Sequence, residues 1–366
     1  MPRLTAVQSP PAAPTIEFIV SVPLDLMNSM YFTHLAKDHE GLEGWATETR
    51  QSMAPDLLAE FDFLYDFPFG EPGLLGTLGD SLWNQPQTWR SVDALLDYVR
   101  NLPLGIGDPE RGLGVEGLAF NITNCDITWP DVNNLTRDQF AAQLEARGIE
   151  VAPVLDVLSR PEELRERMAR VIERVYNGHY KATLPTRLPC LERSVAAHRG
   201  AVTAANVTET LKQISGRDHV CLEPEGVCSA PYKRLRFAPS LDMGPYMSCA
   251  VLGATHGMFY PCERRYIDGD EQGDETVRMA RIYRALSDEQ RLRILDILRE
   301  REMYAQEIVD RTGLGQSMVS RHLGFLKAVG LVNSRRKSNM KFFSLNPDAR
   351  RQLQKTLELF PQGGTR

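Results

Sequence analysis

The chain lacks the signatures of several common enzyme classes. Its 366 residues contain no P-loop, no H-E-x-x-H zinc motif and no G-x-S-x-G nucleophile turn. The run Gly112–Gly117 matches G-x-G-x-x-G in letters, but no strand precedes it and no clear helix follows, so we expect a loop. No residue stands out as a catalyst. We therefore predict that the protein is not an enzyme and needs no cofactor.

The sequence also lacks an apolar secretory signal and any apolar run long enough to cross a bilayer. We expect a cytoplasmic protein with reduced thiols and no membrane contact. Neither Cys221 with Cys228 nor Cys249 with Cys262 has the spacing of a zinc site. Alternation around Cys249 predicts an inward side chain, so we interpret these thiols as buried and structural and predict no metal site. A thiol-based metal or redox sensor remains an alternative.

Acidic and basic residues are unevenly distributed: the C-terminal part of the chain has few acidic residues, and the larger part before it has relatively few basic ones. From Glu275 to the end there are 18 Lys and Arg against 10 Asp and Glu, whereas the preceding residues have 24 against 38. The net charge of −6 hides this separation. A basic C-terminal part joined to an acidic larger part predicts a polyanionic partner for the C-terminal part only.

Glycine, proline and periodicity divide the chain into four segments. The first is rich in proline and alanine without periodicity, and the second is mainly helical between proline- and glycine-rich loops. Its clearest helix starts at Ser159, which has capping-box spacing to Glu162. The expected segments are a disordered leader (1–15), a helical sensor or dimerisation domain (16–267), an acidic linker (268–275) and a DNA-binding domain (276–366).

Strands are expected near the end of the second segment. The runs "YMSCAVL" and "GMFYP" flank a turn from Gly253 to Gly257, which predicts a β-hairpin, and "KRLRF" is a candidate third strand. The fold class is therefore mainly α with minor β: an N-terminal helical domain that ends in a hairpin, then a compact C-terminal domain.

The C-terminal domain begins with two predicted helices. The first has Ser287 as N-cap and Gln290 three residues later, and we expect it to bury Leu292, Ile294, Leu295 and Leu298. The second is the short run "AQEIVDRTGLG", which ends at Gly313. A third helix follows after a tight turn. This order is typical of a helix-turn-helix motif.

The third helix lies in "QSMVSRHLGFLKAVGLV" and has two distinct faces. At about 100° per residue, Val319, Leu323 and Leu326 form a core face, with His322 packed at its edge. Small residues and one arginine gather on the opposite side: Ser317, Ser320, Arg321, Gly324 and Ala328. Small side chains allow a helix to approach closely, so we expect this face to enter a DNA major groove.

A basic hairpin follows the third helix. The run "LVNSRRKSNMKFFSLN" contains two extended stretches joined by a polar turn around Ser338 and Asn339. Four basic residues lie near its tip: Arg335, Arg336, Lys337 and Lys341. This hairpin is the wing expected beside a DNA-binding helix.

The runs "LSDEQRLRILDIL", "QSMVSRHLGFLKAVGLV" and "RRKSNMKFFSL" resemble the winged helix-turn-helix of ArsR-type bacterial transcription regulators. The resemblance covers about the last quarter of the chain, and Gly315 stands where the family usually has serine. The segment Arg301–Ile308, which carries thiols in the metal sensors of this family, has no Cys or His here. The resemblance implies DNA contacts by Gln316, Ser317, Ser320, Arg321, Arg335, Arg336, Lys337 and Lys341.

The larger domain resembles the family less specifically, through "RFAPSLDMGPY", which is similar to a helical extension found in some of these regulators. Its early aromatic residues are expected to form core, although they could also line an apolar pocket. We expect a homodimeric repressor that reads a palindromic operator in double-stranded DNA and responds to a small apolar effector. The alternative is an enzyme or ligand-binding domain of unknown chemistry, with the winged helix as an interaction module. The early aromatic residues of the larger domain, which are expected to form core or to line a pocket, are Trp45, Phe61, Phe63, Tyr65, Phe67, Phe69, Trp83 and Trp89.

Overall fold

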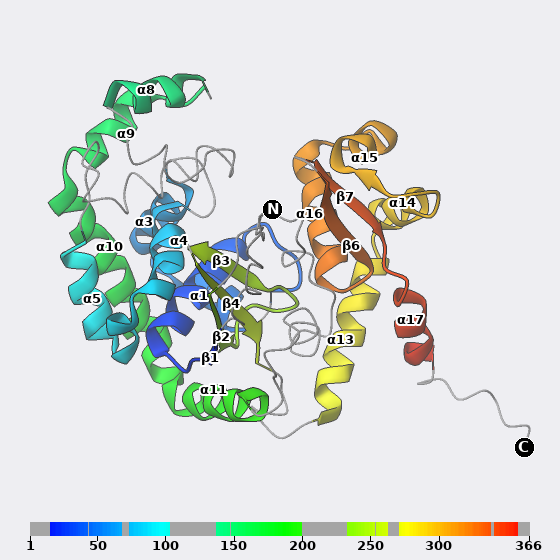
Figure 1. The fold of residues 1–366 in the computed structure, drawn as a ribbon, viewed down its shortest axis with the longest axis horizontal. Coiled ribbons are helices and arrows are strands. Elements are labelled where there is room, and N and C mark those ends of the chain that lie inside the picture. Colours follow the sequence, from blue (N-terminus) through cyan, green and yellow to red (C-terminus); the bar gives the residue numbers. More distant parts are fainter. Residues whose placement is uncertain are drawn as a thin grey trace, which may run out of the picture.

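The structure divides into two units, each with its own hydrophobic core (Figure 1). The first unit holds the elements from β1 to β4, and the second holds those from α13 to α17. The expected leader, apart from Thr15, and the G-x-G-x-x-G run lie outside the described residues. No helix in the described part of the chain could cross a membrane. The computed structural model describes residues 15–42, 44–67, 73–102, 137–146, 148–199, 233–252, 254–262, 271–337 and 340–357.

The helices of the first unit surround one buried helix, α1 (Val22–Leu35). Ser21 begins it, because its Oγ accepts a hydrogen bond of 3.2 Å from the backbone N–H of Leu24. Every residue of α1 except Val22 and Tyr31 is buried, so this helix has no solvated face. The other helices are α2 (Trp45–Ser52), α3 (Pro55–Asp66), α4 (Gly73–Ser81), α5 (Val92–Arg100), α8 (Arg137–Ala146), α9 (Val151–Leu158), α10 (Pro161–Val175) and α11 (Leu184–Arg199).

A four-stranded sheet lies beside α1 and α4. Its strands are β1 (Thr15–Phe18), β2 (Arg234–Ser240), β3 (Ser248–Leu252) and β4 (Thr255–Pro261), in the order β1-β2-β4-β3. β2 pairs in parallel with both β1 and β4, whereas β3 and β4 are antiparallel. One face of the sheet packs on the main core, and the other packs on α11.

The predicted hairpin and third strand are confirmed, as β3 with β4 and as β2. The helical assignment from residue 16 onward is wrong for β1, and Thr15, which we assigned to the leader, starts that strand. Four residues give too little alternation to identify a strand, and the partner of β1 begins only at Arg234. Parallel strands cannot be joined by a tight turn, so no turn signal near β1 in the sequence marks its partner.

Cys249 corrects the expectation of an inward thiol. It lies opposite Met258 on the face of the sheet that packs on α11. Met258 is buried on the inner strand β4, but β3 is an edge strand and Cys249 is exposed. Cys262 is buried as expected, Cys190 is also buried, and the other three cysteines lie outside the described residues.

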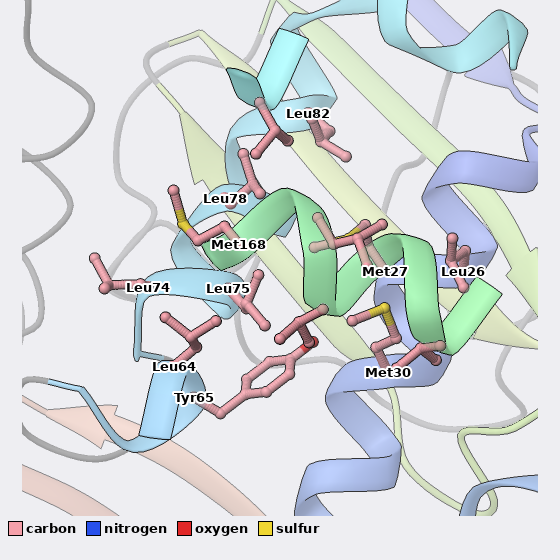
Figure 2. Packing of buried hydrophobic residues seen from close by; sticks show 14 of the residues in the cluster. Leu26, Met27, Met30, Leu64, Tyr65, Leu74, Leu75, Leu78, Leu82 and Met168 are labelled. Atoms are coloured by element: carbon pink, nitrogen blue, oxygen red, sulfur yellow. The ribbon is translucent and has the colours of Figure 1, made fainter. Parts of the chain in front are cut away.

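The main core is formed where α1, α3, α4 and α10 meet. Figure 2 shows Met27 and Met30 of α1 near Met168 of α10, with Tyr65 of α3 and Leu75 of α4 beside them. All five side chains are at most 3% exposed, and burial of such a side chain stabilises the fold by roughly 1.5–3 kcal/mol. The core therefore holds the helical layer on the sheet.

The early aromatic residues mostly belong to this core, as predicted. Trp45 and Trp89 are partly buried against it, and Phe63 is exposed on the outer side of α3. Phe69 lies outside the described residues. The buried members are Phe61, Tyr65, Phe67 and Trp83.

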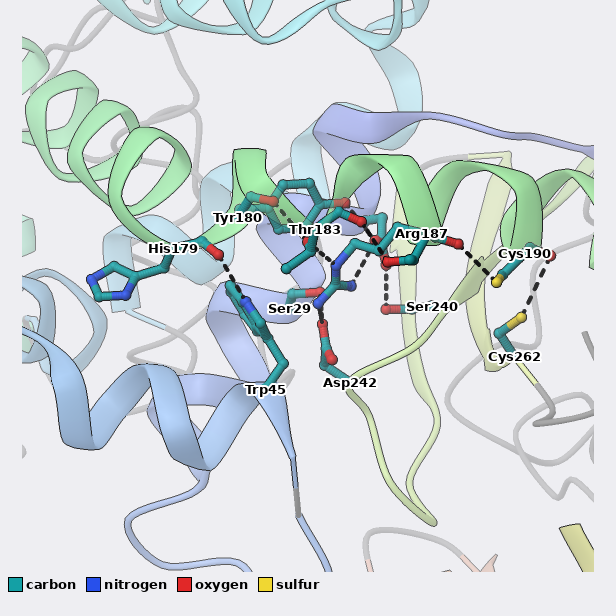
Figure 3. Close-up of polar contacts among 12 residues, drawn as sticks. Ser29, Trp45, His179, Tyr180, Thr183, Arg187, Cys190, Ser240, Asp242 and Cys262 are labelled. Carbon is teal, nitrogen blue, oxygen red and sulfur yellow. Dashed lines mark hydrogen bonds and ion pairs between the residues drawn. The ribbon is translucent and has the colours of Figure 1, made fainter. Parts of the chain in front are cut away.

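A buried ionic network joins α1, α11 and the segment after β2 (Figure 3). Arg187 is 3% exposed and pairs with Asp242 at 2.5 Å and with Asp25 at 3.2 Å. Three hydroxyl groups donate hydrogen bonds to the two carboxylates: those of Tyr180, Ser240 and Ser29. Every carboxylate is thus paired, and removal of one partner from such a network costs about 3–5 kcal/mol. The network fixes α11 against α1.

The second unit is a winged helix-turn-helix. Its helices are α13, α14, α15, α16 and α17, and its sheet has the order β5-β7-β6. The wing strands β6 and β7 are antiparallel as predicted, whereas β5 was not predicted because it has two residues only. The bounds are α13 (Glu271–Leu286), α14 (Glu289–Leu298), β5 (Met303–Tyr304), α15 (Ala305–Thr312), α16 (Gln316–Ala328), β6 (Val332–Lys337), β7 (Met340–Leu345) and α17 (Ala349–Leu357).

The expected linker, residues 268–275, is helical from Glu271 onward. The acidic composition that suggested a linker also suits the first turn of a helix. Acidic residues are common at the start of a helix because of its dipole, and residues 271–275 form the start of α13. Residues 268–270 lie outside the described part of the chain.

The start of α14 is shifted by one residue from the prediction. Asp288, rather than Ser287, is the N-cap, and its Oδ1 accepts a hydrogen bond of 2.9 Å from the backbone N–H of Arg291. The predicted burial is confirmed for Ile294 and Leu298, Leu295 is partly buried, and the prediction is wrong for Leu292, which is 46% exposed. A carboxylate interacts with the helix dipole more strongly than a hydroxyl, which favours the aspartate.

The predicted capping box of α10 is also absent. The helix begins at Pro161 after Arg160, and no side chain caps it. The hydroxyl of Ser159 instead donates a hydrogen bond of 2.7 Å to the carbonyl of Asp156 in the preceding helix. Proline suits the first helical position because that residue needs no N–H donor, so it determines where α10 starts.

Candidate nucleic-acid interface

Helix α16 is positioned by a glycine turn and an apolar face. Gly313 ends α15 with φ of 69°, a left-handed conformation that favours glycine. Gly315 is the N-cap of α16 and has no side chain to occupy the first amides of the helix. Val319, Leu323 and Leu326 are buried, as predicted. The structure therefore contains the expected helix-turn-helix.

The other face of α16 is exposed over its first two turns. The four residues predicted to contact DNA there, Gln316, Ser317, Ser320 and Arg321, are all exposed. The amides at the helix start carry a partial positive charge and can face a phosphate. Hydroxyl, amide and guanidinium groups can also donate hydrogen bonds to base edges. This surface can therefore approach a duplex without rearrangement of α16 itself.

The second half of the same face does not meet solvent. Ala328 is buried and Gly324 is partly buried, and both line a cavity against the first unit. Phe325 is 1% exposed and packs on Gly41, where an added Cβ would lie 2.7 Å from its ring. The small residues of α16 thus serve two purposes by position: the early ones leave room for a partner, and the late ones accommodate the first unit.

His322 is partly buried beside the core face, where we expected a packed histidine. Burial lowers its pKa, and the nearby Arg291 guanidinium acts in the same direction. A neutral, packed imidazole gives little attraction to phosphate, so the exposed residues of α16 are the better candidates for DNA contact.

The wing places four basic residues on one two-stranded ribbon. In the register of β6 and β7, Arg335 lies opposite Phe342, Arg336 opposite Lys341 and Lys337 opposite Met340. The Lys341 ammonium lies 5.3 Å from the centre of the Phe343 ring. The predicted turn residues, 338 and 339, lie outside the described part of the chain.

Arg335 has an internal partner in this structure. Its guanidinium donates two hydrogen bonds to the carboxylate of Glu302 in a bidentate pair, and one of them measures 2.7 Å. The same guanidinium lies over the Phe342 ring. A bidentate pair between a guanidinium and a carboxylate has a fixed geometry. A phosphate would therefore have to compete with Glu302 for Arg335.

The loop after α1 brings two carboxylates to the DNA-binding unit. Asp38 lies 3.4 Å from the guanidinium of Arg321, and Glu40 lies 2.6 Å from that of Arg291. Arg291 is 3% exposed and lies over the Phe325 ring at 5.2 Å. This contact was not predicted from the sequence, because its members are far apart in the chain. The one local signal is an acidic pair directly before the left-handed Gly41.

A cavity of about 350 Å³ lies between the two units. Its walls come from the segment before and within β3, from the end of α16 and from the wing. Lys341, one of the predicted DNA contacts, lines it together with Gly324 and Ala328. The first unit therefore covers one side of the winged helix, while the start of α16 stays open.

Within the described residues there is no group of three or more His, Cys, Asp and Glu side chains that could hold a metal ion. The thiols discussed in the sequence lie apart: Cys249 is exposed on β3, and Cys262 is buried after β4. Cys221 and Cys228 lie outside the described residues.

Comparison with known proteins finds matches to the C-terminal part of the chain. Residues 288–334 match the family described as "Bacterial regulatory protein, arsR family". The transcriptional repressor SdpR of Bacillus subtilis is 32% identical over 68 residues, which are 19% of this chain and 76% of SdpR. The transcriptional activator HlyU of Vibrio cholerae is 37% identical over 65 residues, 18% of this chain and 60% of HlyU.

Among solved structures, the homodimeric winged helix-turn-helix domain of a possible ArsR-family regulator from Mycobacterium bovis is 27% identical to this chain. It covers 26% of this chain and 94% of that domain, with a TM-score of 0.22. The matches to this structure, to SdpR and to HlyU each cover about a quarter of the chain or less.

Proposed function

The chain belongs to the ArsR family of bacterial regulatory proteins, and we propose that it is a DNA-binding transcriptional repressor that reads a palindromic operator as a homodimer. The observation that carries this proposal is the exposed start of α16 beside a basic wing. The residues before Glu275 carry 24 Lys and Arg against 38 Asp and Glu, so the larger part of the chain is acidic and a polyanion is expected to favour the second unit. The binding function therefore belongs to the second unit.

The residues divide into two roles by position. Gln316, Ser317, Ser320 and Arg321 lie at the exposed start of α16, so they are assigned to base edges and nearby phosphates. Arg335, Arg336, Lys337 and Lys341 lie on the wing and are assigned to the phosphate backbone. The first group should set sequence preference, and the second should set affinity and salt dependence.

The dimer follows from the small size of one recognition unit. A single helix and wing make too few contacts for useful specificity, whereas a twofold dimer reads two half-sites about one helical turn apart. Tyr283 of α13 and Leu292 of α14 are 43% and 46% exposed, and apolar side chains of this size support a subunit contact on these two helices.

The direct test is footprinting of the full-length protein on an operator selected from random duplexes. A symmetric protected site with two half-sites is expected, and Arg321→Ala should weaken protection of this site relative to mismatched sites. Arg170→Ala is the matched control, because Arg170 is an exposed arginine on α10, in the first unit. Protection of a single asymmetric half-site would count against the dimer, and no selected sequence at all would count against the function.

The repressor is also proposed to respond to a small molecule bound by the first unit. Supporting this, the first unit contacts α16 directly through Asp38 and Gly41. A ligand that favours this arrangement would favour the DNA-free protein, since an effector acts through its differential affinity for two states. The measurement is operator affinity with and without ligand.

A further inference from the structure

The first unit contains a cavity of about 480 Å³ between α1, α4 and the β3–β4 hairpin. Ligand pockets in proteins commonly have volumes of roughly 300–1,000 Å³ and mostly apolar walls with a few polar groups. The side chains that line this cavity have that composition. Its aromatic walls are Tyr31 and Phe32 of α1, Tyr246 before β3 and Phe259 of β4.

The wall also contains one carboxyl group, Asp80 near the end of α4. The described lining residues include no lysine and no arginine. Asp80 makes no hydrogen bond and no ion pair with any of the described residues, and burial raises the pKa of its carboxyl to about 7. A carboxylate in such surroundings lacks the compensating charge that buried carboxylates normally have.

A second polar group in the same wall is incompletely paired. Asn28 of α1 is 4% exposed, and its Oδ1 accepts a hydrogen bond of 2.8 Å from Ser248. Its Nδ2 has no partner in the described structure. A buried amide N–H without a partner costs free energy, so this donor is available to a ligand acceptor.

We propose that this cavity binds a small organic cation, with its ammonium group at Asp80 and its apolar body against the aromatic walls. The cation supplies the charge that Asp80 lacks, and the aromatic rings attract it further through their negative faces. An anionic ligand would instead be repelled by the negative charge of the Asp80 carboxylate. A polar atom elsewhere on the ligand can accept a hydrogen bond from the Nδ2 of Asn28.

The position of the cavity connects it to the DNA-binding unit. His39, Tyr246 and Cys249 line both this cavity and the one against α16. His39 also stands between Asp38 and Glu40, which pair with Arg321 and Arg291. A ligand here therefore touches the loop that holds α16. This regulatory step rests on the proposed function, whereas cation binding itself does not.

Binding is tested by calorimetry on the full-length protein with three probes of similar shape: 2-phenylethylammonium, neutral 2-phenylethanol and anionic phenylacetate. The ammonium should bind saturably and most tightly. Asp80→Asn should weaken its binding by about tenfold or more, which corresponds to about 1.4 kcal/mol. The same change should leave the weaker binding of the alcohol unaltered.

Two further variants keep the result interpretable. Asp97→Asn removes an exposed carboxylate of α5 that does not line the cavity and should bind the ammonium as the wild type does. Gly79→Leu fills the cavity without change of charge, because a Cβ at Gly79 points toward Met27 in the wall at 3.7 Å. It should abolish binding of all three probes, and cooperative thermal unfolding of each variant shows that it is folded.

The inference is overturned if the ammonium shows no saturable binding, or if Asp80→Asn binds it as tightly as the wild type. The operator assay separates the two proposals. A cation that binds the cavity but leaves operator affinity unchanged supports the site and contradicts effector control. A protein that binds the cation but no duplex contradicts the proposed function and leaves the cation site standing.

Discussion

Asp38, in the loop after α1, lies 3.4 Å from the guanidinium of Arg321 on the exposed face of α16. The larger unit thus pairs one of the residues assigned to DNA contact. Glu40 adds a second carboxylate two residues later, beside Arg291. Negative charge at this position repels the phosphates that α16 would approach. The arrangement in this structure is therefore the one expected to bind DNA less tightly.

Asp38→Asn should raise operator affinity, because it frees Arg321 and removes one negative charge from the DNA-facing side. Both side chains are nearly half exposed, and exposed pairs contribute only about 0.2–1 kcal/mol, so the gain should reach fivefold at most. Fluorescence anisotropy at several salt concentrations measures it, and the gain should shrink as salt increases. An equal gain in Asp97→Asn would show a general charge effect instead.

Gly41→Ala should separate the two units. Gly41 has φ of 82°, and an added Cβ would lie 2.7 Å from the Phe325 ring and 3.3 Å from the Pro245 ring. We expect a loss of unfolding free energy of about 2–4 kcal/mol, from left-handed strain together with the clash. The same opening should increase operator affinity, because Asp38 and Glu40 move away with the loop.

Gly148→Ala is the matched control for this change. Gly148 has φ of 71° with open space around the added Cβ, so it tests the conformational strain alone, worth about 1–2 kcal/mol. Urea unfolding of both variants gives the difference due to the clash. Equal losses in the two variants would mean that the Phe325 contact is not tight.

Wing and helix variants should have different effects on DNA binding. Arg336→Ala and Lys337→Ala should weaken binding to all duplexes and reduce the slope of log affinity against log salt by about one each. Arg321→Ala should reduce discrimination between the operator and a mismatched site by about 1–3 kcal/mol. If the wing changes altered sequence preference and kept the salt slope, the two roles would be reversed.

Glu302→Gln tests whether Glu302 competes with a DNA phosphate for Arg335. It weakens the pairing of Arg335 and should therefore strengthen DNA binding if Arg335 contacts phosphate. Double-variant measurements with Arg335→Ala separate this from other effects. In the Arg335→Ala background, Glu302→Gln should have a smaller effect on affinity.

Asp80→Asn should change how stability depends on pH. The folded pKa of about 7 exceeds the ordinary value of 3.8, so the folded protein retains a proton that the unfolded chain has lost. Asp80 therefore stabilises the fold at low pH, and the free energy of unfolding falls as the pH rises toward 7. The residue is partly exposed, so we expect the variant to gain on the order of 1–2 kcal/mol at about pH 8. At about pH 4 the variant and the wild type should unfold alike.

The winged helix could be predicted from the sequence because its signals are local. Gly313 ends α15 and the apolar spacing of Val319, Leu323 and Leu326 defines α16 within a short stretch. The same spacing correctly identified the exposed start of α16. It could not show that Gly324 and Ala328 face the other unit, because a small residue suits a groove in DNA and a protein contact equally well.

The first unit was harder to predict, because its defining contacts join distant residues. Arg187 pairs with Asp25 and Asp242, and no spacing in the sequence connects these three. Asp80 is similar: a lone acidic residue near a helix end normally reads as solvated, and only the packed structure places it in an apolar wall. Helices with a strong periodicity, such as α10, were identified, although their first residues were not.

The order of strands also sets when this protein can fold during its synthesis. Glu17 of β1 and Arg236 of β2 form an ion pair although they are 219 residues apart. β1 therefore cannot pair with β2 until the residues between them and β2 itself have been synthesised. Such a long closure costs entropy and slows folding. The winged helix has mainly local contacts and leaves the ribosome after the first unit. A ribosome that stops before Arg234 would therefore release helices without their sheet, which chaperones and proteases would have to handle.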